Sequence, residues 1–202
     1  MTVRRTLRIV GNGPWALEIS SWITQDPKNF STYDFAGCVV PSDDGSISCD
    51  PGDHFVMGLL DPREKLKVAA LLISKGGVFV SLRHPTSLIS LRAYMGQGVI
   101  LGPSSVVSCD AVVGDFVSIQ SESIVGHDAR CGDGSTLASR VDVTGFARLG
   151  KGVFLAGQTT ISPSVELGDF VHVEARSVVI RNVAGGLRVG GIPARTLRVT
   201  SP

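Results

Sequence analysis

Residues 113–137 read VGDFVSIQSESIVGHDARCGDGSTL, and an apolar residue recurs at every sixth position of this stretch. The same frame extends in both directions and is apolar at every step: Ile89, Met95, Leu101, Val107, Val113, Ile119, Val125, Cys131, Leu137, Val143, Leu149, Leu155, Ile161, Leu167, Val173 and Val179. The residue four places after each of these is always Ala, Ser, Thr or Val. One large and one small inward residue per six suit a short strand followed by a narrow corner. The pattern therefore predicts a parallel β-helix of hexapeptide repeats, with three hexads in each triangular coil.

The first 84 residues have a different pattern. Short apolar segments at 6–10, 35–40, 55–59 and 78–82 are typical of strands. Apolar residues recur at helical spacing after Pro14, which predicts a first helix. The segment 61–74 begins with acidic residues typical of the start of a second helix. The order β-α-β-β-α-β predicts a small Rossmann-like α/β domain with a parallel sheet. We therefore expect three parts: an α/β domain over 1–84, the β-helix over 85–183, and a C-terminal loop and tail over 184–202.

Composition excludes several classes of function. The formal net charge is +1 and 18 % of the residues are charged, which gives no electrostatic basis for binding nucleic acid or a membrane surface. No apolar run reaches the length of a membrane span. The four cysteines form no C-x-x-C pair and no zinc-ligand spacing. We expect a cytoplasmic protein with reduced thiols.

The turn after the first predicted strand is rich in glycine. Gly11-Asn12-Gly13 precedes the first helix, whose N-terminus would attract the phosphate of a nucleotide-linked substrate. Asp43 follows the second predicted strand, where a carboxylate can hold a ribose hydroxyl. A tight βα turn that binds nothing explains the same residues equally well.

Four segments carry a resemblance that covers nearly the whole chain: Gly11-Asn12-Gly13, Arg83-His84-Pro85, the run from Ile124 to Asp128 with Gly132-Asp133, and the tail Val189–Arg195. With the hexads, they resemble the NeuD/PglD-like sugar O-/N-acetyltransferases of the hexapeptide-repeat acyltransferase superfamily. The resemblance implies a left-handed β-helix, acetyl-CoA as donor, and no metal. It also implies a sugar or nucleotide-sugar acceptor and a homotrimer with active sites between subunits.

The resemblance assigns roles to particular residues. His127 would be the general base, Asp128 would orient it, and the amide of Gly145, eighteen residues on, would hold the thioester oxygen. The tail residues implied at the coenzyme A site are Gly190, Gly191, Pro193 and Arg195, and Gln120 stands at an acceptor position where relatives have Asn. The chain departs from the family pattern at Thr136 and Trp15, where relatives carry His.

Alternatives remain open from the residues alone. His127 and Asp128 suit a solvated turn, because Asp favours corners. Cys109 lies eighteen residues before His127, so a Cys–His acyl-enzyme is conceivable, whereas Cys131 falls on an inward position and should be an inert core thiol. A metal enzyme resembling γ-carbonic anhydrase needs three clustered histidines, but only His127 and His172 lie in the repeats, and they differ in hexad position.

A non-catalytic trimeric scaffold or nucleotide-sugar-binding protein is the other alternative. For the trimer we expect an outward apolar flank that includes Phe116, Phe146 and Phe154.

Overall fold

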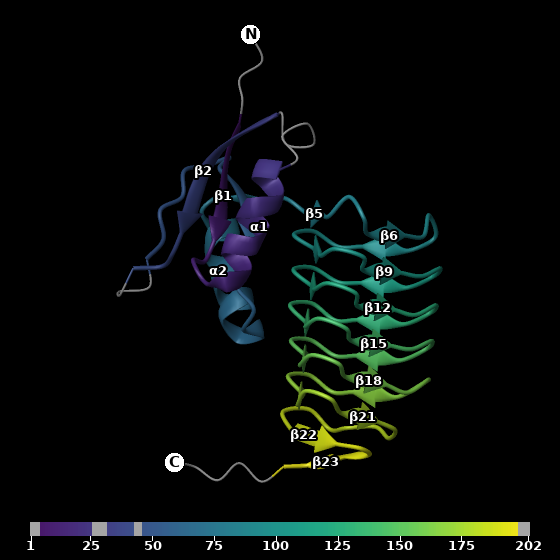
Figure 1. Cartoon of the computed structure of the whole chain (residues 1–202). Helices are drawn as coiled ribbons and strands as arrows, with labels where there is room; N and C mark the ends of the chain where they lie inside the picture. The colour runs from purple at the N-terminus through teal and green to yellow at the C-terminus, as the bar shows by residue number, and fades with distance from the viewer. Residues whose placement is uncertain (1–4, 26–31, 43–45, 198–202) are drawn as a thin grey trace. The chain divides into compact units, whose positions relative to one another are not determined.

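The computed structural model describes residues 5–25, 32–42 and 46–197. The chain divides into two compact units, Met1–Leu82 and Arg83–Pro202. Figure 1 shows both units.

The N-terminal unit holds one four-stranded parallel sheet and two helices. Its elements are β1 (Arg5–Val10), α1 (Pro14–Gln25), β2 (Tyr33–Val39), β3 (His54–Met57), α2 (Pro62–Ser74) and β4 (Val78–Phe79). The strands lie in the order β2-β1-β3-β4, and each neighbouring pair is parallel. The element order is the predicted one, but β3 and β4 end earlier than the predicted strands. After β3, Gly58 packs so closely that a Cβ there would lie 2.7 Å from Cγ2 of Ile9.

Both helices begin where the sequence signals place them. Pro14 is the first residue of α1, a position at which its missing N–H leaves no bond unmade. The carboxylate of Asp61 accepts a hydrogen bond from the backbone N–H of Glu64 at 2.8 Å and so caps α2. Gly76, at φ +85°, turns the chain out of α2 toward β4.

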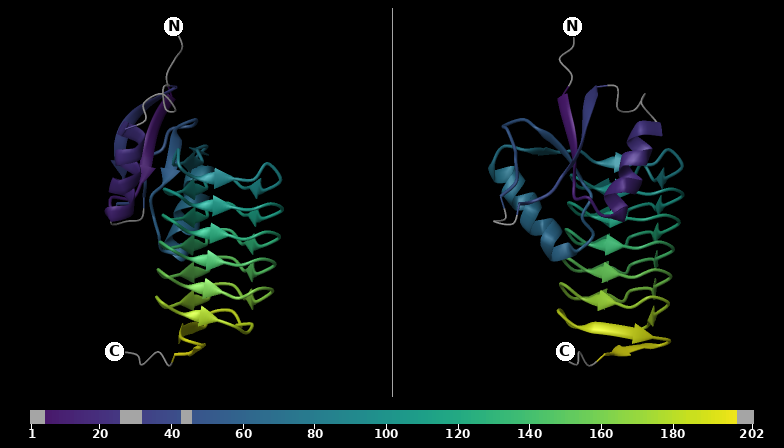
Figure 2. Two further views of the ribbon diagram at one scale, coloured as in Figure 1. Left: turned by 45° about the vertical axis from the view of Figure 1, so that its right-hand side comes forward. Right: turned by 60° about the vertical axis from the view of Figure 1, so that its left-hand side comes forward.

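The second unit is a parallel β-helix whose coils stack along one axis (Figures 1 and 2). Sheet I contains β7 (Tyr94–Met95), β10 (Val112–Val113), β13 (Arg130–Cys131), β16 (Arg148–Leu149) and β19 (Glu166–Leu167). Sheet II contains β5 (Leu82–Arg83), β8 (Ile100–Leu101), β11 (Ser118–Ile119), β14 (Thr136–Leu137), β17 (Phe154–Leu155), β20 (His172–Val173), β22 (Arg188–Gly191) and β23 (Ala194–Thr196). Sheet III contains β6 (Leu88–Ile89), β9 (Val106–Val107), β12 (Ile124–Val125), β15 (Asp142–Val143), β18 (Thr160–Ile161) and β21 (Val178–Val179). A repeat of eighteen residues therefore separates stacked positions, as Val107, Val125 and Val143 show.

The interior is built as the hexads predict. The sixth-position residues from Leu101 to Val179 form one buried core, and the small residues at the corners are buried with them. The buried corner serines keep their hydrogen bonds: the hydroxyl of Ser123 donates to the carbonyl of Ala138 at 2.7 Å and accepts from the N–H of Val141 at 3.0 Å. Burial of these polar groups therefore leaves no bond unmade.

The last coil is shorter than the others. His172 pairs with Arg188, sixteen residues on, whereas the stacked residues of earlier coils are eighteen apart. Sheet I accordingly ends at β19, and the side-chain oxygen of Asn182 accepts the hydrogen bond from the N–H of Glu166 at 2.9 Å. A side chain thus satisfies an amide that a further strand would otherwise satisfy.

Candidate functional site

His127 lies in the turn 126–129, which joins sheet III to sheet I. We call the stack of these turns the His edge: residues 108–111, 126–129, 144–147 and 162–165. Nδ1 of His127 lies 3.0 Å from Oδ2 of Asp128, and the two side chains are 55 % and 43 % exposed. Asp128 adopts φ +59°, a left-handed conformation that Asp tolerates better than most residues. Because the carboxylate engages Nδ1, Nε2 is the nitrogen left for a substrate.

Gly145 lies on the same edge, one coil further along. A Cβ on Gly145 would lie 2.6 Å from Nε2 of His127 and 2.7 Å from its Cε1, so the imidazole rests against the bare Cα. Only glycine leaves room for the ring in this position. None of the described residues accepts a hydrogen bond from the Gly145 N–H. The expectation that His127 and Gly145 share one edge is confirmed.

Phe146, which contacts His127, and Asp142, on the strand before the Gly145 turn, were not singled out for this site from the sequence. The ring of Phe146 meets the imidazole edge-on, with centroids 5.0 Å apart and an interplanar angle of 89°. The N–H of Phe146 also donates to the carbonyl of His127 at 3.0 Å. Asp142, on β15 before the Gly145 turn, has its carboxyl pKa raised by burial. The eighteen-residue stacking period was the available signal, since Phe146 stacks on Asp128.

Cys109 occupies the same edge one coil before His127, as its spacing predicted. Its carbonyl accepts the N–H of Asp128 at 3.1 Å and its side chain is exposed. Within the described segments no hydrogen bond joins its Sγ to the imidazole. Cys131 is buried in the core, and burial raises its thiol pKa to about 12, which confirms an inert core thiol.

Gln120 lies on a different edge from His127. It begins the turn from sheet II to sheet III, where its N–H bonds to the carbonyl of Leu137 at 2.9 Å and its Oε1 accepts from Ser139 at 3.4 Å. Gln120 lies in the turn before strand β12 and His127 lies in the turn after it, so the strand separates the two residues. A single chain therefore does not bring Gln120 to the base.

The tail residues form a hairpin at the end of the β-helix. Gly190 and Arg195 pair across β22 and β23. Gly191 adopts φ +100°, and Pro193 lies in the turn that follows it. The exposed guanidinium of Arg195 donates to the carbonyl of Ala194 at 3.0 Å. This hairpin extends sheet II in the last coil, so it does not touch the His127 turn.

The expected apolar flank is wrong as a single surface. Phe116 is buried in a turn from sheet I to sheet II, Phe146 is exposed on the His edge, and Phe154 lies on the outer face of sheet II. Phe116 and Phe146 share a hexad position but lie at different corners, and Phe154 lies on a strand, so the three side chains are on different sides of the coil.

The glycine loop of the N-terminal unit borders a hollow of about 480 Å³. Gly11, Asn12 and Gly13 line it together with Trp15 and Glu64. The described part of this lining contains a carboxylate but no basic side chain. Asp43 lies outside the described residues.

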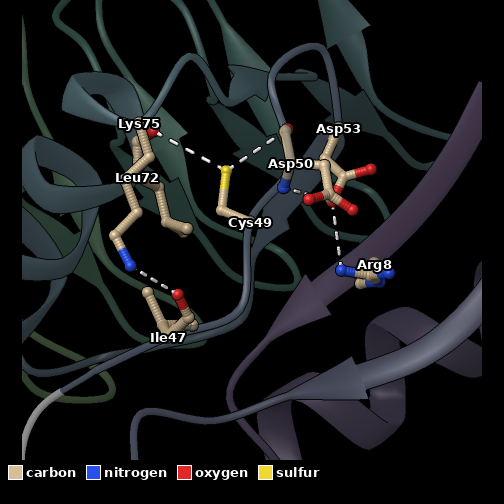
Figure 3. Close-up of polar contacts among 7 residues, drawn as sticks. All are labelled: Arg8, Ile47, Cys49, Asp50, Asp53, Leu72 and Lys75. Carbon is tan, nitrogen blue, oxygen red and sulfur yellow. Dashed lines mark hydrogen bonds and ion pairs between the residues drawn. The ribbon is translucent and has the colours of Figure 1, made fainter.

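Elsewhere in the N-terminal unit, polar contacts hold the segment before β3 (Figure 3). Lys75 donates to the carbonyl of Ile47 at 2.8 Å, and Asp53 accepts from Arg8 at 3.1 Å. The thiol of Cys49 points to the carbonyls of Asp50 and Leu72. These contacts connect the segment to the end of α2 and to β1.

In the segments 5–25, 32–42 and 46–197, no three His, Cys, Asp or Glu side chains are grouped to hold a metal ion. The helices of these segments are all too short or too polar to span a bilayer.

No protein-family model and no curated protein matches the chain. Several solved structures do match in fold. PerB from Caulobacter crescentus, in complex with CoA and GDP-perosamine, is 22 % identical with a TM-score of 0.83 over 96 % of this chain and 97 % of that one. The acetyltransferase domain of PglB from Neisseria gonorrhoeae, also solved with acetyl coenzyme A, is 18 % identical with a TM-score of 0.80 over 96 % and 100 %. WeeI from Acinetobacter baumannii is 18 % identical with a TM-score of 0.62 over the same shares.

The chain shares the fold of these proteins. The likeness covers both units and supports the left-handed β-helix that the resemblance implied. The resemblance to NeuD/PglD-like acetyltransferases is therefore supported at the level of the fold.

Proposed function

We propose that the protein is an acetyltransferase that moves an acetyl group from acetyl-CoA to a sugar, with a nucleotide-linked amino sugar as the favoured acceptor. One observation carries this proposal: His127 is held by Asp128 at 3.0 Å with its Nε2 against Gly145 of the next coil. PerB, which has the same fold, is a perosamine N-acetyltransferase whose structure contains CoA and GDP-perosamine. We propose that the same class of reaction takes place at the turn that contains His127.

The geometry gives each residue a chemical task. Asp128 accepts from Nδ1–H, so the lone pair of Nε2 can take a proton from the attacking amine. As the nitrogen bonds to the acetyl carbonyl carbon, the carbonyl oxygen becomes negative, and the free N–H of Gly145 can stabilise it. The intermediate then collapses, the C–S bond breaks, and the imidazolium returns its proton to the leaving thiolate. The step yields an amide and a free thiol.

The N-terminal unit is proposed as the Rossmann-like part that holds the nucleotide. Gly11, Asn12 and Gly13 line the hollow at the start of α1, where backbone N–H groups favour an anion. Glu64, on the same lining, would repel a phosphate nearby but can accept hydrogen bonds from ribose hydroxyls. Asp43 and Gln120 keep their proposed acceptor roles, Gln120 by way of a neighbouring subunit.

The resemblance also supports the assembly. In a homotrimer with its sites between subunits, the His edge of one chain would face a neighbour, whose tail residues Gly190, Gly191, Pro193 and Arg195 could cover the donor. The half-exposed side chains of His127 and Phe146 suit such a groove. Sedimentation of the active protein as a monomer would contradict this assembly.

The decisive experiment measures thiol release from acetyl-CoA with nucleotide-linked amino sugars and, separately, with free sialic acid. We expect turnover with an amino sugar and its loss in His127→Asn. Turnover with sialic acid alone would shift the proposal to O-acetylation. A protein that binds nucleotide sugars but releases no thiol with any acceptor would instead be the non-catalytic binding protein.

A further inference from the structure

One acidic residue of the β-helix differs from the other acidic residues in having no partner. Nine Asp and Glu residues lie within the described residues 83–197. Eight of them are engaged by a basic side chain, a side-chain amide or a backbone N–H: Asp110, Asp115, Glu122, Asp128, Asp133, Glu166, Asp169 and Glu174. The ninth is Asp142, whose carboxylate accepts no hydrogen bond and forms no ion pair within the described segments.

Asp142 lies on the outer face of sheet III, in a column of side chains that is otherwise uncharged. The column follows the register partners of β6, β9, β12, β15, β18 and β21 (Figure 1) and contains Leu88, Val106, Ile124, Asp142, Thr160 and Val178. The direct neighbours of the carboxylate in this column are therefore Ile124 on one side and Thr160 on the other. Neither of these side chains carries a charge that could balance it.

The surroundings of Asp142 disfavour its charged form. The residue is half-buried, and burial raises the pKa of its carboxyl. Burial is the sole cause of this pKa shift, so no described cation lies close enough to oppose it. Arg140, two residues earlier in the chain, donates instead to Glu122 at 3.0 Å. A partly desolvated carboxylate without a donor is unfavourable, and a ligand that donates hydrogen bonds to it would remove that cost.

The column passes close to the candidate base. Ile124 precedes His127 by three residues, and Asp142 precedes Gly145 by three. Three residues of extended chain span at most about 11 Å. Because the His127 imidazole rests against the Cα of Gly145, the backbone of Asp142 is no further than this from the glycine beneath the ring. A sugar ring with its substituents can therefore extend from Nε2 of His127 to the Asp142 carboxylate.

We propose that the Asp142 carboxylate binds ring hydroxyls of the acceptor sugar while the amine of that sugar lies at Nε2 of His127. This inference rests on the proposed function and deepens it, because it places the acceptor over sheet III and selects a hydroxylated ring rather than a simple amine. A carboxylate suits this task, since it only accepts hydrogen bonds and its two oxygens can take two neighbouring hydroxyls. Ile124 offers an apolar surface for the C–H face of the ring, a combination typical of small-molecule sites.

The test measures acceptor affinity by calorimetry and acceptor KM by thiol release, with the full chain and the nucleotide-linked amino sugars of the thiol-release assay. We expect acceptor binding to weaken roughly tenfold in Asp142→Asn, which keeps one weaker acceptor oxygen, and roughly a hundredfold in Asp142→Val, which keeps none. The KM for acetyl-CoA should stay unchanged in both. Valine already occupies two other places in the column, so the Asp142→Val strand should still form.

The matched control is Glu166→Gln. Glu166 has the same hexad position as Asp142 but lies on sheet I, where it is 3.7 Å from Arg148. This variant should bind the acceptor like the parent. An equal loss of affinity in Glu166→Gln and Asp142→Asn would show a general effect of removing negative charge and would overturn the site.

Analogues of the same sugars, each with one ring hydroxyl replaced by hydrogen, test the contact directly. The parent should bind the analogue that lacks the contacted hydroxyl roughly tenfold more weakly than the complete sugar. Asp142→Val should bind that analogue and the complete sugar about equally, because the two changes remove the same hydrogen bond. If every hydroxyl matters as much in the variant as in the parent, the carboxylate does not bind the ring.

The remaining outcomes separate this site from the proposed function. Unchanged acceptor affinity in Asp142→Val, with acetyl transfer by the parent, overturns the site alone. A changed oligomeric state of Asp142→Asn in sedimentation would assign the carboxylate to a contact between subunits and also overturns the site. Acceptor binding that depends on Asp142, without thiol release, supports the site and overturns the proposed acetyl transfer. If the parent binds none of the sugars, both proposals are wrong.

Discussion

Two histidines of the β-helix, His127 and His172, have similar neighbours but different settings. His127 has Asp128 on Nδ1 and Phe146 edge-on at 5.0 Å, and it lies at a corner. His172 lies on the outer face of sheet II, stacked on Phe154 at 4.8 Å with an interplanar angle of 14°. Its Nε2 is the nitrogen that faces a carboxylate, Glu174, at 3.6 Å.

The difference shows that a histidine, an acid and an aromatic ring do not by themselves make a base. His172 shares its carboxylate with Arg188, and burial lowers its pKa. His127 has its acid partner on Nδ1 and its Nε2 against a glycine that leaves space for a substrate. The corner therefore leaves Nε2 of His127 accessible to a substrate, whereas on the flat sheet Nε2 of His172 faces a carboxylate.

Replacing the two histidines should have the largest and most unequal effects. His127→Asn removes the base and should lower the rate of thiol release by about 10²- to 10⁴-fold, the usual contribution of general-base catalysis. His172→Asn should leave that rate within about twofold of the parent, since Nε2 of His172 faces Glu174. Equal losses in the two variants would remove the distinction between corner and face.

Gly145, which packs against the His127 ring, and Gly152, which packs against the Phe170 ring, offer a second contrast. A Cβ on Gly145 would displace the His127 imidazole, so Gly145→Ala should lower activity by roughly a hundredfold with little change in stability, because that ring can swing into solvent. A Cβ on Gly152 would lie 2.4 Å from the Phe170 ring, at φ +64°. Gly152→Ala should instead cost about 1–3 kcal/mol of stability, measured by urea unfolding, with activity retained. The reverse assignment of activity and stability losses would refute the site.

Removing the acid partner should have an intermediate effect. Asn tolerates the left-handed backbone of residue 128, so Asp128→Asn tests the charge rather than the turn. Without the carboxylate the imidazolium formed during transfer is less stable, and we expect the rate to fall roughly tenfold to a hundredfold. An unchanged rate would make Asp128 only a turn residue.

Phe146 should matter less than either acid or base. An aromatic pair of this geometry contributes about 0.5–1.5 kcal/mol, so Phe146→Leu should lower the rate by roughly two- to twelvefold. Phe154→Leu, which removes the ring beside His172, is its matched control and should leave the rate unchanged. A loss in both would indicate a general packing effect.

The smallest effect concerns the pH dependence of stability. Desolvation lowers the pKa of His172 in the folded state, with Glu174 opposing and Arg188 assisting the shift. Between that lowered pKa and the ordinary value near 6.5, the unfolded chain binds more protons, so stability falls as pH drops through this range. His172→Gln should reduce this acid-side loss, as measured by urea unfolding at pH 7 and below. An unchanged slope would mean that burial does not perturb His172.

The hexads made the β-helix predictable because its core repeats locally. Each six-residue unit contains its own inward and corner residues, so the register of His127 over Gly145 followed from counting eighteen residues. The role of Gln120 rests on the resemblance alone, and the structure places Gln120 on another edge of the same chain. In the N-terminal unit the helix caps were found from local signals, but the ends of β3 and β4 depended on packing that the sequence does not display.

The sequence alone determined that the chain coils, where its core lies, and which residues share the edge of His127, because these properties depend on a short repeat and strand geometry. Only the tertiary structure decided that Nε2 rests on Gly145, that Phe146 meets the imidazole edge-on, and that Asp142 has no cationic partner among the described residues. Rotamers and side-chain pairs depend on neighbours many residues away. That is why the edge could be predicted and its contacts could not.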